Sequence, residues 1–405
     1  MTLVIVGGGL AGAKAAETLR EEGFTGPVVL VCAEAERPYE RPPLSKGYLL
    51  GAAERDTAFV HPESWYAEHD VDLRLGTRAT ALDPTAHEVE LTGGERIRYE
   101  KLLLATGSTP RRLDVPGADL DGVSYLRELR HADHIRRVLS PGRRVAIVGA
   151  GWIGLEVAAA ARHHGAEVTV FEIADLPLQG VLGDEVARVF ADLHREHGVD
   201  LRLGASIQEI GGDGGRVSTV VTPGGEQLGV DAVIVGVGIR PSIELATAAG
   251  LTIEDGVAVD AAFRTSAPDV YAAGDVAAAE HPLLGTRVRV EHWANALNAS
   301  PAAARSMLGQ DVTYDELPYF FTDQYDLGME YIGYAPPRSY DRVVTRGDLG
   351  GREFQAFWLR GGHAAAAMHV NMWDDGIDPL KELVRSGRVL DPDRLANPSV
   401  PFGDV

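Results

Sequence analysis

The stretch VAIVGAGWIGLEVAAAARHHGAEVTVFE, from Val145 to Glu172, decides the fold of this 405-residue chain. It reads as a buried strand, a glycine turn, a helix of small residues and a second strand that ends in an acid. Gly149, Gly151 and Gly154 have the spacing that permits a tight turn, the close approach of a pyrophosphate and close helix packing. Glu172 can accept hydrogen bonds from ribose hydroxyls, although a surface acid would fit the same position. The stretch therefore predicts a dinucleotide site.

The beginning of the chain repeats this pattern in LVIVGGGLAGAKAAETLREEGFTGPVVLVCAE, from Leu3 to Glu34. Its glycines are Gly7, Gly9 and Gly12. Glu34 is the candidate ribose ligand, and Glu36 competes with it because a strand end can be placed only to within a residue or two. Two dinucleotide sites in one chain predict hydride transfer between a nicotinamide and a flavin. We expect FAD at the first site and NADH at the second.

Repetition at longer range indicates two copies of one domain plan. HDVDLRLGTRATALD from His69 returns as HGVDLRLGASIQEIG from His197, and KLLLATGSTP from Lys101 returns loosely as DAVIVGVGIRP from Asp231. Continuous apolar runs such as LVIVG and AVIVGVG are typical of parallel strands buried on both faces. We predict an α/β fold with two doubly wound dinucleotide-binding domains.

The chain after Gly309 has a different character. REFQAFWLRGGHAAAAMHVNMW reads as two strands around a Gly-Gly turn, and DPLKELVRSG reads as a helix. This segment predicts a C-terminal α+β domain with an antiparallel sheet. The expected boundaries are 1–113 and 246–310 for the FAD-binding domain, 114–245 for the NAD-binding domain and 311–405 for the C-terminal domain.

The charge of the chain argues against two classes of partner. It carries 38 basic and 59 acidic side chains, and the formal net charge of -21 repels nucleic acid phosphates and anionic lipid headgroups. No apolar run approaches the roughly 20 residues that span a bilayer, and the first residues enter a strand instead of a cleavable leader. We expect no nucleic acid partner, no membrane partner, a cytoplasmic location, and a monomer or weak dimer.

The chain has a single cysteine, Cys32, in the apolar run VVLVC. A disulfide oxidoreductase needs a pair of thiols near its flavin, and a metal or iron–sulfur site built on cysteine needs several. The 13 histidines show no metal-ligand spacing. We expect no metal, and we interpret Cys32 as a core residue.

Five motifs resemble a known family: YERPPLSKGYLLG, LLLATGSTPR, SYLREL, TSAPDVYAAGDVA and PYFFTDQYD. Over essentially its whole length the chain is similar to the FAD-dependent, NADH-linked ferredoxin reductases that serve bacterial oxygenases. The resemblance implies a glutathione-reductase-like fold, FAD, NADH and a small [2Fe–2S] ferredoxin as the electron acceptor.

The resemblance also implies which residues contact FAD. They are Ala11, Glu34, Arg41, Lys46, Ala79, Thr106, Gly107, Arg127, Asp275 and Trp293. Ala79 would contact adenine through its backbone, and Asp275 would accept a hydrogen bond from a ribityl hydroxyl. By itself, a Gly-Asp pair at a strand end fits a helix cap as well as a ligand, and Trp293 fits core packing as well as contact with the flavin.

The catalytic residues implied by the resemblance are Lys46 and Glu156. Lys46 and Arg41 would lie by the isoalloxazine and the phosphates, where a cation stabilises the reduced flavin, which is anionic at N1. A solvated loop charge is the alternative interpretation for either cation. Glu156 is expected beside Lys46 and the nicotinamide, at a helix position that an ordinary packed helix would fill with an apolar residue.

One segment departs from the family pattern. Many relatives carry Trp at the positions of Tyr319 and Phe321, and Ser at Thr322, in the segment that lies over the flavin and at the rim where the acceptor docks. The departure leaves the acceptor open: the alternative to a ferredoxin is a small acceptor, as in monodehydroascorbate- or quinone-reducing flavoproteins. A signalling or nucleic-acid-binding flavoprotein is a third possibility, and the net charge of -21 argues against it.

Overall fold

The computed structural model describes residues 2–374 and 376–405. This part of the chain forms two compact units. The first unit contains the chain up to Arg41 together with Glu54–Thr109 and Ile239–Pro318. The second contains Pro42–Ala53, Pro110–Gly238 and Tyr319–Val405. Each unit has its own five-stranded parallel sheet, so the predicted α/β class with two doubly wound domains is confirmed. The domain boundaries given above remain predictions.

The parallel sheet of the first unit has the strand order β19-β7-β1-β2-β3. Its strands are β1 (Leu3–Val6), β2 (Val28–Val31), β3 (Val71–Arg74), β7 (Lys101–Leu104) and β19 (Val270–Ala272). β1 and β2 are fully buried apolar runs, as strands covered on both faces require. β19 pairs with β7, so the chain completes this sheet only after it has passed through residues 110–238.

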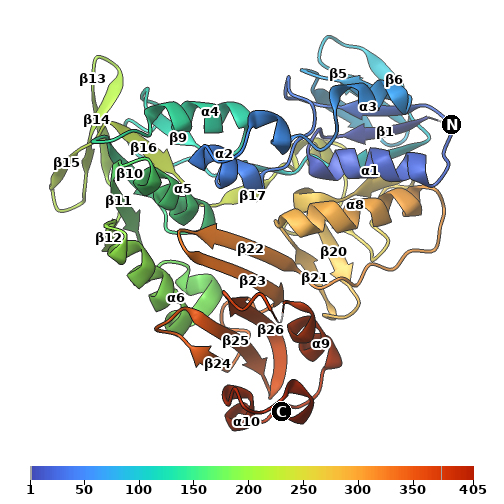
Figure 1. Ribbon diagram of the computed structural model, residues 1–405. Helices are drawn as coiled ribbons and strands as arrows, with labels where there is room; N and C mark the ends of the chain where they lie inside the picture. The colour runs from blue at the N-terminus through green and yellow to red at the C-terminus, as the bar shows by residue number, and fades with distance from the viewer. Residues whose placement is uncertain (1, 375) are drawn as a thin grey trace. The chain divides into compact units, whose positions relative to one another are not determined.

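Helices of small residues cover this sheet. Helix α1 (Leu10–Glu21) follows β1 and lies beside α8 (Trp293–Met307), with alanines of both helices in the shared core (Figure 1). The remaining helices and strands of the unit are α3 (Glu63–Glu68), β4 (Ala79–Asp83), β5 (Glu88–Leu91), β6 (Arg96–Arg98), β17 (Ile239–Pro241), α7 (Glu244–Ala248), β18 (Val257–Val259), β20 (Ala277–His281) and β21 (Thr286–Arg289). Strand β8 (Ser108–Pro110) pairs with β17.

The parallel sheet of the second unit has the order β12-β11-β10-β16-β9. Its strands are β9 (Val123–Tyr125), β10 (Arg144–Val148), β11 (Glu167–Glu172), β12 (Asp200–Leu203) and β16 (Ala232–Val235). Its helices are α4 (Leu129–Val138), α5 (Trp152–His163) and α6 (Gln179–Glu196). The antiparallel strands β13 (Glu209–Asp213), β14 (Arg216–Val221) and β15 (Gln227–Gly229) connect β12 to β16. Unlike the first sheet, this one is built from a single continuous segment.

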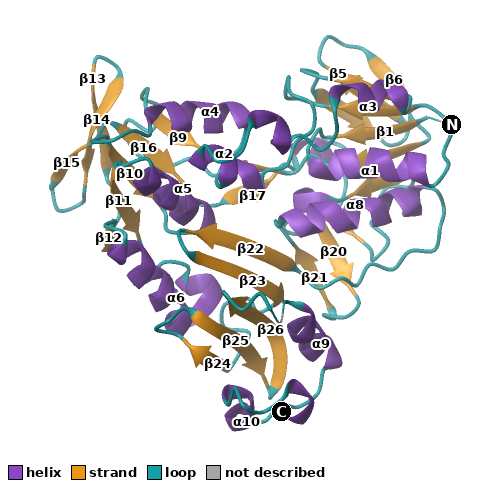
Figure 2. Ribbon diagram, viewed as in Figure 1, coloured by secondary structure: helices purple, strands orange, loops and turns teal. Residues whose placement is uncertain are grey.

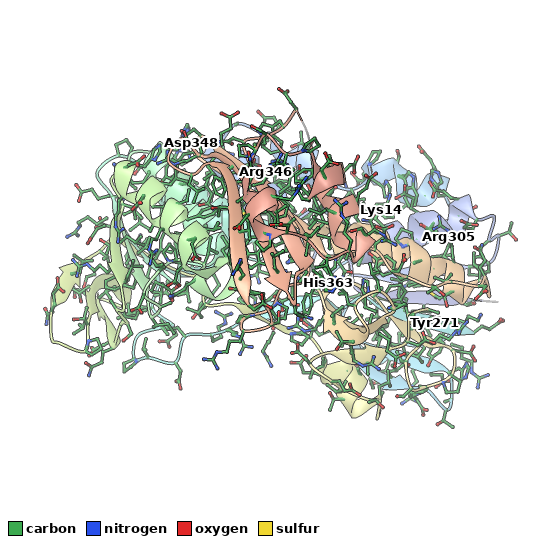
Figure 3. The ribbon with its side chains drawn as sticks, turned by 90° about the horizontal axis from the view of Figure 1, so that it is seen from below. Lys14, Tyr271, Arg305, Arg346, Asp348 and His363 are labelled. Atoms are coloured by element: carbon green, nitrogen blue, oxygen red, sulfur yellow. The ribbon has the colours of Figure 1, made fainter. Side chains whose placement is uncertain are left out.

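The predicted C-terminal sheet also belongs to the second unit (Figure 2). Its antiparallel order is β22-β23-β26-β25-β24. The strands are β22 (Tyr319–Gln324), β23 (Leu327–Gly333), β24 (Arg342–Asp348), β25 (Glu353–Arg360) and β26 (His363–Val370), and the helices are α9 (Asp378–Ser386) and α10 (Pro392–Ala396). The Gly-Gly turn lies between β25 and β26, as predicted. Arg346 of β24 (Figure 3) donates hydrogen bonds to the carbonyls of Asn397 and Val400, which attach the final segment to the sheet.

Candidate cofactor and active site

The first glycine loop has a backbone that only glycine permits. Gly7 has φ 133°, and a Cβ there would lie 2.0 Å from the carbonyl oxygen of Ala105. A Cβ on Gly12 would lie 2.0 Å from the carbonyl oxygen of Gly7, so glycine lets α1 start directly against β1. A Cβ on Gly9 would meet no described atom within 4 Å. Gly9, the N-cap of α1, therefore faces open space where a pyrophosphate can approach the helix terminus.

The second loop has the same construction. Gly149 has φ 99°, and a Cβ there would lie 2.4 Å from the carbonyl oxygen of Gly236. A Cβ on Gly154 would lie 2.0 Å from the carbonyl oxygen of Gly149, and a Cβ on Gly151 would have no described atom within 4 Å. Both loops thus fit a dinucleotide, because in each the middle glycine leaves the helix N-terminus accessible.

Glu172, the last residue of β11, and Glu34, in the loop after β2, are held differently. Glu172 Oε2 accepts a hydrogen bond of 2.7 Å from the backbone N–H of Ala150 in the second loop, and Oε1 accepts one of 2.9 Å from that of Ala174. The register pairs Val6 with Val31 and Val148 with Phe171, so the residue equivalent to Glu172 in the first sheet is Cys32. Glu34 lies two positions further along the chain and has no such contact with its loop.

Cys32 instead packs beneath the first loop. It is 1 % exposed, and a Cβ on Gly8 would lie 2.3 Å from its Sγ. Burial, assisted by the charge of Glu34, raises the pKa of the Cys32 thiol to about 12. A buried thiol that stays protonated is a poor nucleophile, which supports the interpretation of Cys32 as a core residue.

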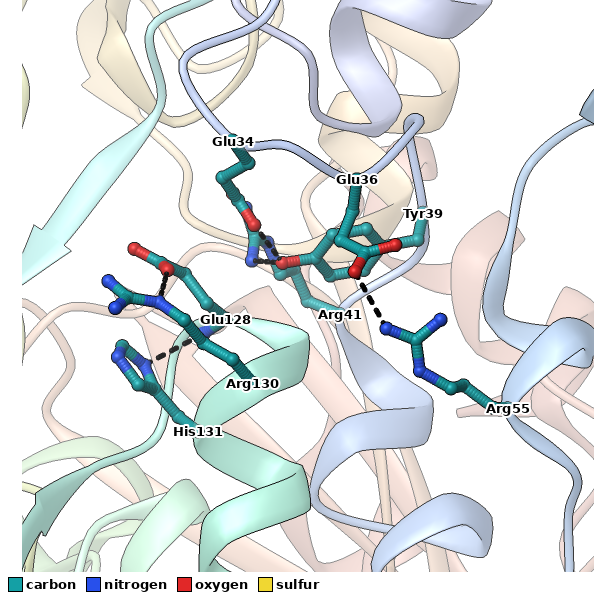
Figure 4. Close-up of polar contacts among 8 residues, drawn as sticks. All are labelled: Glu34, Glu36, Tyr39, Arg41, Arg55, Glu128, Arg130 and His131. Carbon is teal, nitrogen blue, oxygen red and sulfur yellow. Dashed lines mark hydrogen bonds and ion pairs between the residues drawn. The ribbon is translucent and has the colours of Figure 1, made fainter. Parts of the chain in front are cut away.

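Glu34 is held by side chains of the loop that follows β2 (Figure 4). Arg41 Nη2 lies 2.8 Å from Glu34 Oε1, and the hydroxyl of the buried Tyr39 donates to Glu34 Oε2. Arg41 Nη1 also donates to the Tyr39 oxygen at 2.6 Å. The competing acid, Glu36, pairs with the half-exposed Arg55 at 2.8 Å. Two of the predicted ligands, Glu34 and Arg41, thus contact each other and Tyr39, a residue for which no role was predicted from the sequence.

Asp275 and Trp293 lie in the first unit, in elements that are far from the first loop in the sequence. Gly274 has φ 77°, and a Cβ there would lie 3.0 Å from the Cβ of Ala11, so the turn that carries Asp275 is packed against α1. Trp293 is the first residue of α8. Burial raises the pKa of the Glu40 carboxyl, although the polar side chain of Trp293 acts in the opposite direction.

Replacing Asp275 with alanine is expected to lower the FAD content of the purified protein. The carboxylate is half-buried, and a ribityl hydroxyl that loses its acceptor costs about 1–3 kcal/mol, or about tenfold in FAD affinity. Flavin absorbance per chain and titration of the apoprotein with FAD measure this effect. Asp72→Ala, at an exposed carboxylate of β3, is the control, and an unchanged FAD affinity for Asp275→Ala would reduce Asp275 to a turn residue.

The remaining predicted FAD contacts lie in both units. Ala79 begins β4, Thr106 Oγ1 donates to the carbonyl of Ser242 at 2.8 Å, and Gly107 has φ 64°. Arg127 lies in the second unit, between β9 and α4. At the start of α4, Glu128 and His131 cap the helix (Figure 4). The roles of all these residues toward a cofactor remain predictions.

Lys46 and Glu156 form a buried ion pair within the second unit. Lys46 Nζ lies 2.7 Å from Glu156 Oε1, and the two side chains are 15 % and 2 % exposed. Glu156 comes from α5, whereas Lys46 is presented by the short turn Pro42–Leu44 and by helix α2 (Gly47–Leu50), whose buried Leu49 anchors it in the core. Lys46 is therefore not a solvated loop charge.

Three donors satisfy the Glu156 carboxylate. Oε1 accepts from Lys46 and, at 2.6 Å, from the hydroxyl of Thr322 in β22, and Oε2 accepts from the hydroxyl of Ser45. Phe321 places its ring centroid 5.1 Å from Lys46 Nζ. Such an arrangement places a carboxylate with three hydrogen-bond donors beside a cation, with an aromatic ring next to the cation. Ser45 and Thr322 lie in two of the family motifs, but no role of their hydroxyls was predicted from the sequence.

Within residues 2–374 and 376–405, no three His, Cys, Asp or Glu side chains are grouped as a metal site requires. None of the helices described has the length and the apolar character needed to cross a bilayer.

Comparison with known proteins gives two family matches. The family described as pyridine nucleotide-disulphide oxidoreductase matches residues 1–300, and the family described as reductase C-terminal matches residues 319–405. A 5,5'-dehydrodivanillate O-demethylase ferredoxin reductase subunit from a Sphingobium species is 40% identical, with 99% of this chain and 97% of that protein covered. Putidaredoxin reductase from Pseudomonas putida is 35% identical, with 100% and 96% covered.

Solved structures of reductases are also similar to this chain over nearly its whole length. The covalent putidaredoxin reductase–putidaredoxin complex matches with a TM-score of 0.95 and 34% identity, covering 99% of this chain and 97% of that chain. A ferredoxin reductase from Rhodopseudomonas palustris matches with a TM-score of 0.94 and 34% identity, covering 99% and 98%.

Proposed function

Because this chain belongs to the pyridine nucleotide-disulphide oxidoreductase family, we propose that it passes electrons from NADH through FAD to a small [2Fe–2S] ferredoxin that serves an oxygenase. The chain is a flavoprotein oxidoreductase that uses FAD and NAD(H). The observation that carries the proposal is the pair of glycine loops, one on each parallel sheet, both built so that a pyrophosphate can reach a helix N-terminus.

The residues of the chain supply binding, orientation and charge. FAD, when bound, accepts a hydride equivalent from NADH and releases the electrons one at a time. Gly9 and Gly151 leave room for the two pyrophosphates, and Asp275 offers an acceptor beside the first loop. Lys46 supplies a buried positive charge, and Glu156 holds that charge in place through its carboxylate. No general base is needed for this chemistry.

The single cysteine separates this chain from relatives that reduce disulfides. A dithiol mechanism needs two thiols close to the flavin, and the chain has one Cys, which is buried and whose pKa is raised. The proposed acceptor is therefore a one-electron protein. We also propose, on composition alone, a cytoplasmic monomer or weak dimer that has no nucleic acid or membrane partner.

Mixing the NADH-reduced protein with candidate acceptors in a stopped-flow instrument tests the proposal. Rapid reoxidation by a [2Fe–2S] ferredoxin is expected, with little reaction with glutathione disulfide or lipoamide. Fast turnover with a quinone or monodehydroascorbate, and none with ferredoxins, would favour the small-acceptor alternative. A folded protein that takes up no FAD would contradict both.

Reduction of an acidic ferredoxin is expected to weaken as salt is added. The segment around α4 exposes arginines at positions 130, 136, 137 and 143, which can steer an acidic partner over about a Debye length. Arg137→Glu combined with Arg143→Glu should lower kcat/KM for the ferredoxin about tenfold at low salt and leave the NADH step unchanged. Arg96→Glu, on exposed β6, is the control. Salt-independent reduction would remove this docking surface from the proposal.

A further inference from the structure

A buried chain of hydrogen bonds leads from the last turn of α6 to Glu156. His194 Nε2 lies 2.9 Å from Gln324 Oε1, and Gln324 Nε2 lies 3.1 Å from Thr322 Oγ1. Thr322 Oγ1 in turn lies 2.6 Å from Glu156 Oε1. None of these four side chains belongs to a residue more than 3 % exposed. The two middle groups come from alternate positions of β22, so they share one face of the strand.

The chemistry of these groups gives the chain of bonds one direction. Glu156 Oε1 accepts a hydrogen bond from the Lys46 ammonium, and Thr322 donates its hydroxyl proton to the same oxygen. The Thr322 oxygen then accepts from the amide N–H of Gln324, which turns the Gln324 carbonyl toward His194. His194 must therefore carry its proton on Nε2. Every donor along the chain points toward the Glu156 carboxylate.

Burial keeps His194 in the neutral form that this arrangement requires. Desolvation lowers the pKa of His194 to about 4, the bond to Gln324 opposes this shift, and the nearby His197 adds to it. The Tyr325 hydroxyl lies 3.5 Å from His194 Nδ1, and the Tyr325 ring stacks on His197 with a centroid separation of 3.7 Å. His194 is thus a neutral donor with a fixed tautomer at the far end of the chain.

We propose that His194 is a positioning residue that orients Glu156 through Gln324 and Thr322. Without the His194 donor, the Gln324 amide is free to turn over, and the Thr322 hydroxyl loses the donor that fixes its direction. Donors aligned in series polarise one another and strengthen the last bond, here the bond to a charged acceptor. Glu156 would then hold Lys46 less firmly. The hydrogen-bond geometry does not depend on the proposed function, whereas the expected effect on the rate of FAD reduction rests on it.

The tautomer of His194 is tested in the protein without NADH. Two-bond ¹H–¹⁵N correlation spectra of histidine-labelled protein, with the signal assigned by its loss in His194→Gln, are expected to show a neutral Nε2–H ring at neutral pH. Gln324→Leu should change this signal. An imidazolium or an Nδ1–H ring would overturn the proposal whether or not the protein reduces a ferredoxin.

The kinetic test compares His194→Leu with His194→Gln. The leucine variant removes the donor and is expected to slow reduction of bound FAD at saturating NADH about tenfold, because a small loss of alignment is costly at a reacting site. The glutamine variant places an N–H donor near the position of Nε2 and should recover most of the rate. A wild-type rate for the leucine variant, or equal slowing in both, would overturn the proposal.

A double-mutant cycle distinguishes a positioning role of His194 from a general loss of structure. If His194 acts through Thr322, then adding His194→Leu to Thr322→Val should slow the reduction by less than a further twofold or so, since the path is already broken. If the two substitutions instead slow FAD reduction by independent factors that multiply, the proposal is contradicted. His281→Leu is the matched control: His281 is also buried and bonds the carbonyl of Glu316 at 2.9 Å in the first unit. His281→Leu should lower the free energy of unfolding without changing the rate of FAD reduction.

Discussion

Replacing Lys46 with methionine is expected to slow the reduction of bound FAD by NADH about 100-fold and to lower the flavin midpoint potential. The size follows from the typical cost of removing one fixed, desolvated electrostatic contact from an active site. Lys46 is such a group, because its ammonium is 2.7 Å from Glu156 and its side chain is only 15 % exposed. Stopped-flow absorbance gives the rate, and a dye-linked titration gives the potential.

The same substitution leaves the Glu156 carboxylate buried without its cation, which typically costs about 3–5 kcal/mol of stability. The double variant Lys46→Met with Glu156→Gln removes both charges, so it should recover most of the stability, measured by urea unfolding, and remain slow. Lys381→Ala, on α9, is the matched control. A Lys46→Met protein with normal rate and potential would limit Lys46 to a structural ion pair.

The wild-type protein is expected to prefer NADH over NADPH by at least about tenfold in kcat/KM, or about 1.4 kcal/mol. The Glu172 carboxylate is fixed at the second loop by the N–H groups of Ala150 and Ala174, and a 2′-phosphate close to it would be repelled. The chain that follows adds a further acid, Asp175, and offers no Lys or Arg before α6.

Two substitutions, made one after the other, should reduce the preference for NADH over NADPH. Glu172→Ala removes the repulsion, and adding Ile173→Arg places a cation on a side chain that is 79 % exposed and has room to reach a phosphate. Glu167→Ala, at the opposite end of β11, should leave the preference unchanged. Equal kcat/KM for the two nucleotides in the wild type would show that Glu172 does not lie at the ribose.

The parallel sheets were predictable because each buried strand is a continuous apolar run and because the first and last glycines of each loop motif stand where a Cβ would meet a backbone carbonyl. The register of the strands was harder to read. Glu34 and Glu172 look equivalent in the sequence, yet Cys32 is the residue that pairs into the position of Glu172. Each acid follows an apolar run in the sequence, but only Glu172 belongs to its strand, and the pairing of the strands is what distinguishes the two acids.

The side chains around Glu156 illustrate a second limit of sequence patterns. Thr322 and Gln324 come from the C-terminal sheet, Ser45 from the proline turn and His194 from α6, and nothing local in any of these segments points to the others. The only signal was the spacing of Thr322 and Gln324, two polar residues on one face of β22, and it is visible once β22 is known to pack against α5.

The separate origin of β19 affects the order in which the chain is assembled on the ribosome. The sheet of the second unit is complete once Val235 has emerged, whereas the first sheet still lacks β19 and its covering helix α8. The amino-terminal unit therefore finishes after the sheet inserted into it, the reverse of the usual order of synthesis. Asp275 and Trp293, two predicted flavin ligands, also emerge after Val235, so we expect flavin capture to follow the formation of the parallel sheet of the second unit.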